Sequence, residues 1–162
     1  MRIRDILDPH RIVLDVQGDT KRDILTLLAG TVIDTHKSID GNRLVEVLLK
    51  REETSTTAIA DGIAIPHGKM ILGEEVICTF GRSLPGLNFD SVDGKPTHLF
   101  FLLISPESHP SLHLRWLAHL AVLLKNADLR QRLMEADSAD AVLSVIEEEE
   151  EARAAEAPAS DQ

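Results

Sequence analysis

The sequence predicts a layered α/β or α+β fold in which helices cover a β-sheet. Runs of apolar and β-branched residues with the length of strands lie at 12–16, 63–65, 76–82 and 98–104. Between them lie segments whose apolar residues recur at helical spacing. The run at 98–104 is almost continuously apolar, so we expect it to form a central strand that is buried on both faces.

The first half of the chain predicts one strand and two helices. Residues 3–7 mix apolar and charged side chains and favour a short helical turn before the first strand. Asp19 or Thr20 can cap the helix that follows this strand, because both side chains accept hydrogen bonds from free helical N–H groups. A second helix is expected to begin at Asp40 and to end near Arg51.

The second half predicts a long loop and a series of helices around the central strand. Residues 84–96 are rich in glycine and proline and favour a loop. Ser108 is a candidate N-cap for a helix over 111–125, whose histidine and leucine residues form one stripe. After one further short helix, the last helix is expected to begin at Ser138 and to end at Ile146.

The C-terminal segment 147–162 differs in composition from the rest of the chain. It begins with five consecutive glutamates and is rich in alanine. Such a segment buries too little apolar surface to offset its ordering entropy. We therefore expect one domain over residues 1–146, followed by an acidic, disordered, solubilising tail.

Composition excludes several classes of partner and location. The chain has 162 residues, one Trp, four Phe and no Tyr, so the core is expected to be aliphatic and stacking on nucleic-acid bases is not expected. The formal net charge of −10 also argues against nucleic-acid binding. The single Cys78 cannot form an internal disulfide, and no signal peptide or apolar run of about 18 residues is present. We expect a cytoplasmic protein without membrane insertion.

The segment from Thr54 to Lys69 reads T-S-T-T-A-I-A-D-G-I-A-I-P-H-G-K and carries the most information about function. Its short apolar run is expected to be a buried strand, which the Pro66-His67-Gly68 turn ends. His67 would then lie at the end of a rigid element and be open to solvent. From the local pattern alone, an ordinary turn histidine remains an equal interpretation.

This segment resembles the active-site signature of the IIA components of the phosphoenolpyruvate-dependent phosphotransferase system, in the fructose, mannitol and nitrogen-regulatory class. The resemblance rests on G-I-A-I-P-H-G-K, extends back to Arg51 and forward through 84–96 to the helix around His113, and covers about 1–146. It implies a mixed sheet with helices on both faces. It also implies that His67 accepts a phosphoryl group, as tele-phosphohistidine, from a histidine-phosphorylated carrier protein resembling HPr.

The resemblance further implies the residues that surround this phosphoryl group. Arg51 and His113 fall at the positions of the family's active-site arginine and second histidine. Thr56, Thr57 and the N–H group of Gly68 are plausible further donors to phosphate oxygens. No cofactor and no metal are expected. Phosphoryl transfer of this kind requires a nucleophile in line and cationic or donor groups around the equatorial oxygens, and neutral imidazole is a good nucleophile near pH 7.

Three positions differ from the family pattern. Thr56 stands where serine is usual and keeps the hydroxyl, Ala60 replaces a frequent glycine, and Asp61 replaces a frequent asparagine. Ala60 is tolerable if its φ is negative. Asp61 would weaken phosphate acceptance if it pointed inward, but we expect it to be a turn residue that faces outward.

Four functions remain open at this point. A free-standing, nitrogen-type regulatory IIA protein is favoured, and a sugar-specific IIA that passes phosphate to a separate IIB component is the alternative. Whether the chain counts as an enzyme depends on that choice. A third possibility is an interaction module that is not phosphorylated. A fourth is a zinc hydrolase using His67, His98 and His113, although the sequence lacks H-E-x-x-H.

Overall fold

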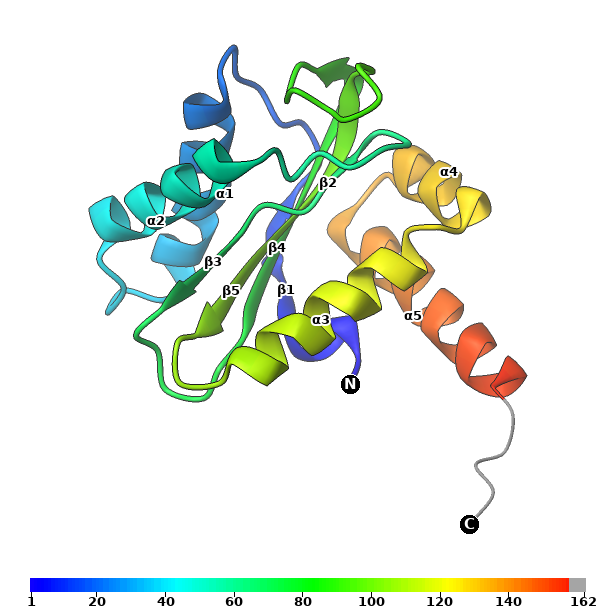
Figure 1. Cartoon of the computed structure of the whole chain (residues 1–162). Helices are drawn as coiled ribbons and strands as arrows, with labels where there is room; N and C mark the ends of the chain where they lie inside the picture. The colour runs from blue at the N-terminus through cyan, green and yellow to red at the C-terminus, as the bar shows by residue number, and fades with distance from the viewer. Residues whose placement is uncertain (158–162) are drawn as a thin grey trace.

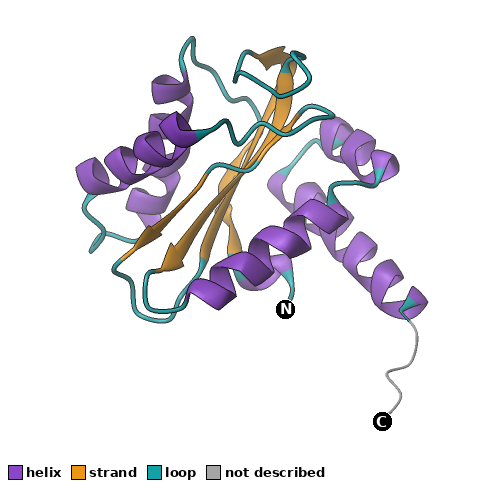
Figure 2. Cartoon of the chain, viewed as in Figure 1, coloured by secondary structure: helices purple, strands orange, loops and turns teal. Residues whose placement is uncertain are grey.

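The protein forms a mixed β-sheet between two layers of helices, as predicted (Figure 1). The structure is a computed structural model and describes residues 1–157. Two helices, α1 and α2, cover one face of the sheet, and α3, α4 and α5 lie on the other side (Figure 2). No helix of the described residues is both long and apolar enough to cross a membrane.

The elements alternate along the chain as the sequence pattern indicates. In chain order they are η1 (Ile3–Asp5), β1 (Leu7–Val13), α1 (Lys21–Thr35), α2 (Gly41–Thr54), β2 (Ile63–Ala64), β3 (His67–Met70), β4 (Ile77–Leu87), β5 (Thr97–Pro106), α3 (Pro110–Leu123), α4 (Ala127–Glu135) and α5 (Ala139–Glu156).

The strand β5 organises the sheet. The strand order is β1-β4-β5-β2, and β3 also pairs with β5. Strand β5 runs antiparallel to β4 but parallel to β2 and β3, so β2 and β3 follow one another along the same side of β5. This arrangement places His67, the first residue of β3, in register with Leu103 of β5.

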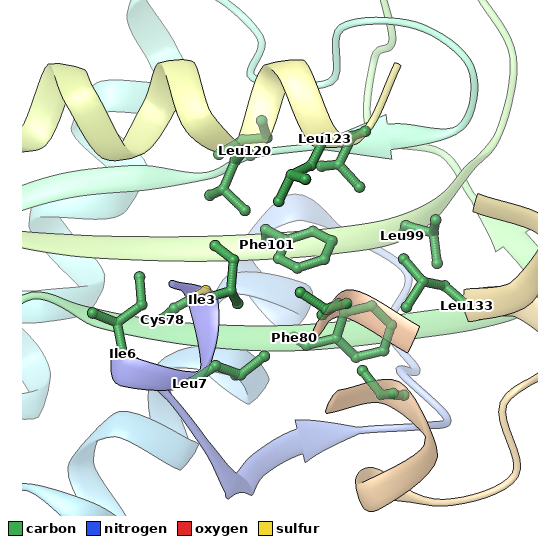
Figure 3. Packing of buried hydrophobic residues seen from close by; sticks show 14 of the residues in the cluster. Ile3, Ile6, Leu7, Cys78, Phe80, Leu99, Phe101, Leu120, Leu123 and Leu133 are labelled. Carbon is green, nitrogen blue, oxygen red and sulfur yellow. The ribbon is translucent and has the colours of Figure 1, made fainter. Parts of the chain in front are cut away.

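The core consists of two apolar layers, one on each face of the sheet. Side chains of β5 alternate between them, as a pleated strand requires. Phe101 packs edge-on against Phe80 in the layer below α3, α4 and α5 (Figure 3), and Phe100 packs edge-on against Phe89 in the layer below α1 and α2. The prediction that the apolar run at 98–104 forms a central strand buried on both faces is therefore confirmed.

Side-chain caps fix the starts of the helices. Thr20 caps α1 by accepting from the N–H of Asp23, and Asp40 and Ser138 cap α2 and α5 in the same way. The predicted N-cap at Ser108 is wrong. His109 holds that position, because Pro110 is the first helical residue and the Ser108 hydroxyl bonds instead to the His109 ring.

Two strands differ from their predicted ranges. The strand expected at 12–16 is β1 over Leu7–Val13, because Leu7 pairs with β4 as well as Ile12 and Val13, with an irregularity in register between Leu7 and Ile12. Strand β4 continues to Leu87 through part of the predicted loop at 84–96. A register shift after Arg82 and the left-handed φ of 85° at Gly86 let the chain remain paired there despite Pro85.

The predicted disordered tail from Glu147 is wrong for the residues that the structure describes, because α5 continues to Glu156. Glu150 explains this extension. Glu150 is only 9% exposed. Both of its carboxylate oxygens accept from the Ile3 N–H, at 3.1 Å each, and one of them lies 2.7 Å from Nε2 of His119. The expected boundary after Ile146 thus falls inside a helix, whereas residues 158–162 lie outside the described part of the chain.

Candidate functional site

Strands β2 and β3 position His67. The predicted turn at Pro66-His67-Gly68 is wrong, because pairing with β5 resumes immediately: the Leu103 N–H donates to the Pro66 carbonyl at 2.9 Å, and β3 begins at His67. Gly68 is needed for packing rather than for a positive φ. A Cβ atom there would lie 2.7 Å from Cγ1 of Val47 on α2.

Both ring nitrogens of His67 are hydrogen-bonded, and the partners define the tautomer. Nδ1 lies 2.7 Å from the carbonyl oxygen of Ile65, which can only accept, so Nδ1 carries the hydrogen. Nε2 is then unprotonated and accepts a hydrogen bond from Nε of Arg51 at 3.2 Å. The ring is half-buried, and the two hydrogen bonds fix its orientation.

Arg51 reaches the site from the last turn of α2. Its Nη1 donates to the carbonyl oxygen of Ser55 at 3.0 Å, while its Nε contacts the His67 ring. The helix ends three residues after Arg51, and the chain then turns back toward the sheet. The guanidinium therefore presents a fixed positive charge and directional donors beside Nε2 of His67.

His113 lies in the first turn of α3 and is 4% exposed. Its ring centroid is 5.3 Å from that of His67, and the two rings are inclined at 53°. Its Nδ1 lies 2.7 Å from the hydroxyl oxygen of Ser105, near the end of β5. Two histidines and an arginine from three different elements therefore meet at one point.

Burial keeps both histidines neutral near pH 7. Desolvation is the main cause of the lowered pKa of His67, the Arg51 charge lowers it further, and the hydrogen bond to the Ile65 carbonyl opposes the shift. Desolvation is also the main cause that lowers the pKa of His113 to about 4. The charge of His67, when that ring is protonated, and the charges of Lys69 and Arg51 lower it further. A cluster with an unprotonated, oriented imidazole next to a permanent cation is suited to accept an anionic group.

The family described as "Phosphoenolpyruvate-dependent sugar phosphotransferase system, EIIA 2" matches residues 5–149. The chain belongs to this family. It is 36% identical over 146 residues to a nitrogen regulatory protein of Bradyrhizobium diazoefficiens, across 90% of this chain and 95% of that protein. The fructose-specific EIIABC component of Bacillus subtilis is also 36% identical over 146 residues, but the match covers 90% of this chain and only 23% of that protein.

Solved structures agree with this assignment. The crystal structure of nitrogen regulatory protein IIA-Ntr from Neisseria meningitidis superposes with a TM-score of 0.82 at 30% identity, covering 89% of this chain and 98% of that one. The IIA mannitol structure from Escherichia coli, at 19% identity and a TM-score of 0.70, shares the fold; its match covers 86% of this chain and 97% of that chain.

The hydroxyls predicted as phosphate donors in this EIIA domain are engaged elsewhere in the structure. Thr57 Oγ1 donates to Oε2 of Glu52 at 2.6 Å, and Thr56 Oγ1 donates to the Phe89 carbonyl at 3.0 Å. Gly68 is buried within β3 and paired with Ile104. Their assignment as phosphate donors stays a prediction. Arg51, His67 and His113 are the predicted residues that the fold brings together.

The departures from the EIIA signature are accommodated. Ala60 is not among the residues with positive φ, so the missing glycine costs no backbone strain. Asp61 is exposed, lies in a turn with a left-handed φ of 57°, and its N–H donates to Oδ2 of Asp93 at 3.2 Å. The expectation that Asp61 is an outward turn residue is confirmed.

Sequence reasoning missed three residues near the cluster of Arg51, His67 and His113. Glu52 is 6% exposed and accepts from both the N–H and the hydroxyl of Thr57, which fixes the loop after α2. Lys69 follows His67 by two positions on β3, so its charge lies on the same face of the strand. Ser105 contacts the His113 ring. The spacing of Lys69 was readable from the motif, whereas nothing local distinguishes Glu52 from its exposed neighbour Glu53.

The geometry does not support the zinc hydrolase interpretation. His98 lies at the opposite end of β5 from Ser105, and its Nδ1 bonds to the Ser83 carbonyl at 3.0 Å. The fold therefore pairs His67 with His113 and separates both from His98. Among the residues that the structure describes, no group of three histidine, cysteine or acidic side chains is arranged to hold a metal.

Proposed function

We propose that this EIIA domain is a phosphoryl carrier that accepts its phosphate on Nε2 of His67 from a histidine-phosphorylated protein resembling HPr. The observation that carries the proposal is the hydrogen bonding of the His67 ring. Nδ1 is held by the Ile65 carbonyl, which leaves Nε2 unprotonated beside the guanidinium of Arg51. A protein that receives its phosphate from an HPr-like donor is expected to work in the cytoplasm.

The transfer step follows from that geometry. The lone pair of Nε2 attacks phosphorus, and the new N–P bond forms as the N–P bond of the donor histidine breaks. The donor ring, which is protonated on its other nitrogen, takes the electron pair and leaves as neutral imidazole. Nδ1 keeps its hydrogen toward the Ile65 carbonyl throughout. Arg51 supplies positive charge to the transferring oxygens, and His113 is close enough to hydrogen-bond the phosphoryl group after transfer.

A regulatory, nitrogen-type role is favoured over a sugar-specific one. The support is that the nitrogen regulatory proteins of Bradyrhizobium diazoefficiens and Neisseria meningitidis match over nearly their whole lengths. The alternative is a IIA component that passes phosphate to a separate IIB protein. It has support from the fructose-specific EIIA component of Haloferax volcanii, which is 33% identical over 137 residues, across 85% of this chain and 89% of that protein.

The test is transfer of labelled phosphate from a phosphorylated HPr-type carrier to the full chain. Wild-type protein and His10→Ala, which changes an exposed histidine outside the site, should both become labelled, whereas His67→Ala should not. Equal labelling of His67→Ala would exclude His67 as the acceptor. Absence of labelling in the wild type would favour the third possibility, an interaction module. Onward transfer to purified IIB components then separates the sugar-specific role from the regulatory one.

A further inference from the structure

The contact between Ser105 and His113 has a consequence for the direction of hydrogen bonding in the site. Ser105 is fully buried near the end of β5, and its hydroxyl oxygen lies 2.7 Å from Nδ1 of His113. The Ser105 side chain makes no other hydrogen bond to the residues that the structure describes. The second nitrogen of His113, Nε2, has no hydrogen-bond partner among residues 1–157 and is not sealed from solvent.

Two arrangements of the hydrogens are compatible with a distance of 2.7 Å. If Nδ1–H of His113 donates to Ser105, the serine O–H hydrogen is left buried without an acceptor, which carries the cost of an unmade hydrogen bond. If the serine O–H donates to an unprotonated Nδ1, no buried donor is left unpaired. The hydrogen of the neutral imidazole is then on Nε2, the nitrogen that is not sealed from solvent.

We propose that Ser105 is a positioning residue that holds neutral His113 in its Nε2–H tautomer, so that His113 donates to a phosphoryl oxygen on His67. The two histidines then have opposite tautomers. The Ile65 carbonyl makes Nε2 of His67 an acceptor and nucleophile, and the Ser105 hydroxyl makes Nε2 of His113 a donor. The tautomer matters because a neutral imidazole has a single N–H, and the opposite choice would direct a lone pair at the anionic group.

The predicted effect on phosphorylation rests on the proposed function, whereas the predicted tautomer of His113 does not. The structural test is an NMR measurement of histidine ring nitrogens in the unphosphorylated full chain, labelled with nitrogen-15 at histidine. In the wild type, Nδ1 of His113 should be unprotonated and Nε2 protonated, with the reverse pattern at His67 as an internal reference. A wild-type His113 protonated at Nδ1 would overturn the proposal, whatever the outcome of any phosphorylation assay.

Variants then separate positioning from packing. Ser105→Ala should introduce the Nδ1–H tautomer of His113 and reduce the equilibrium extent of phosphorylation by about threefold to tenfold. Ser105→Thr, which keeps the hydroxyl, should retain both the wild-type tautomer of His113 and the wild-type extent of phosphorylation. Ser83→Ala removes another fully buried serine hydroxyl, on β4, and should change neither. Unchanged ring-nitrogen signals in a folded Ser105→Ala would contradict the proposal, and failure of that variant to fold would leave the wild-type tautomer to decide.

Discussion

Nε of Arg51 donates to Nε2 of His67 at 3.2 Å, so the arginine occupies the lone pair of the nitrogen that we propose to be phosphorylated. The same guanidinium is tied to the Ser55 carbonyl through Nη1. An arriving phosphoryl group must therefore replace the ring nitrogen as the acceptor for Nε. In the transfer that we propose, Arg51 would cover Nε2 of His67 before the phosphoryl group arrives and would then lie next to its oxygens.

Replacing Arg51 by lysine should impair phosphate acceptance although it preserves the charge. Lysine cannot contact Nε2 of His67 and the Ser55 carbonyl with one planar group, so charge-assisted hydrogen bonds are lost. A loss of about 1.5–3 kcal/mol corresponds to a decrease of roughly 10- to 150-fold in the rate of labelling from a phosphorylated carrier. Arg43→Lys, an exposed change on the same helix, is the control and should transfer at the wild-type rate. Equal rates for both variants would remove Arg51 from the mechanism.

The nucleophile should remain active below the ordinary pKa of histidine. Only the neutral ring of His67 can attack, and burial lowers its pKa from the usual value of 6.5. Loss of labelling through His67 protonation should therefore set in at a lower pH than it would for a histidine with the usual pKa of 6.5. Replacing Arg51 with glutamine removes a charge that lowers this pKa, so the midpoint should move to higher pH. An NMR titration of His67 in both proteins measures it, and a midpoint that moves downward would contradict the prediction.

The buried His113 should make the fold sensitive to acid. Its pKa is about 4 in the folded chain, mainly because of burial, against 6.5 in the unfolded chain, so the unfolded state binds more protons between these values. This contribution is constant above about pH 6.5 and is lost as the pH falls from there toward 4, by about 3 kcal/mol in all. Urea unfolding at several pH values should show a shallower acid slope for His113→Gln than for wild type, and parallel slopes would refute this.

Glu52 should contribute more to stability than its neighbour Glu53. Removing the Glu52 carboxylate leaves the N–H and hydroxyl of Thr57 without their acceptor and separates Lys21 from its partner at 2.9 Å. We expect Glu52→Ala to lower the free energy of unfolding by about 3 kcal/mol. Glu53 is exposed, and Glu53→Ala should stay within about 0.5 kcal/mol of the wild type. Chemical denaturation of the two variants decides the matter, and similar values would show that the buried carboxylate is not structural.

The end of α5 should be required for full stability. A chain that stops at Ile146 loses Glu150, which holds the Ile3 N–H and the His119 ring. We expect its free energy of unfolding to be about 2–4 kcal/mol lower than that of a chain that stops at Ala157. Within the full chain, Glu150→Ala should reproduce much of this loss, whereas the exposed Glu151→Ala should not. If both truncated chains are equally stable, residues 147–156 act as a dispensable tail after all.

The sequence by itself determined the features that depend on neighbouring residues. The caps at Thr20, Asp40 and Ser138 follow from local hydrogen bonding, and the apolar run around Phe101 could be placed at the centre of a sheet. These signals lie within one turn or one strand and do not depend on distant parts of the chain.

Tertiary structure decided what depends on partners far along the chain. The pairing of Pro66 with Leu103 turned an apparent turn into the start of β3, and the contact of Glu150 with Ile3 extended α5 through a run of glutamates. The same holds for the contact of Ser105 with His113. A carboxylate or hydroxyl that is buried and paired looks the same in sequence as an exposed one, because burial is a property of the whole packed chain.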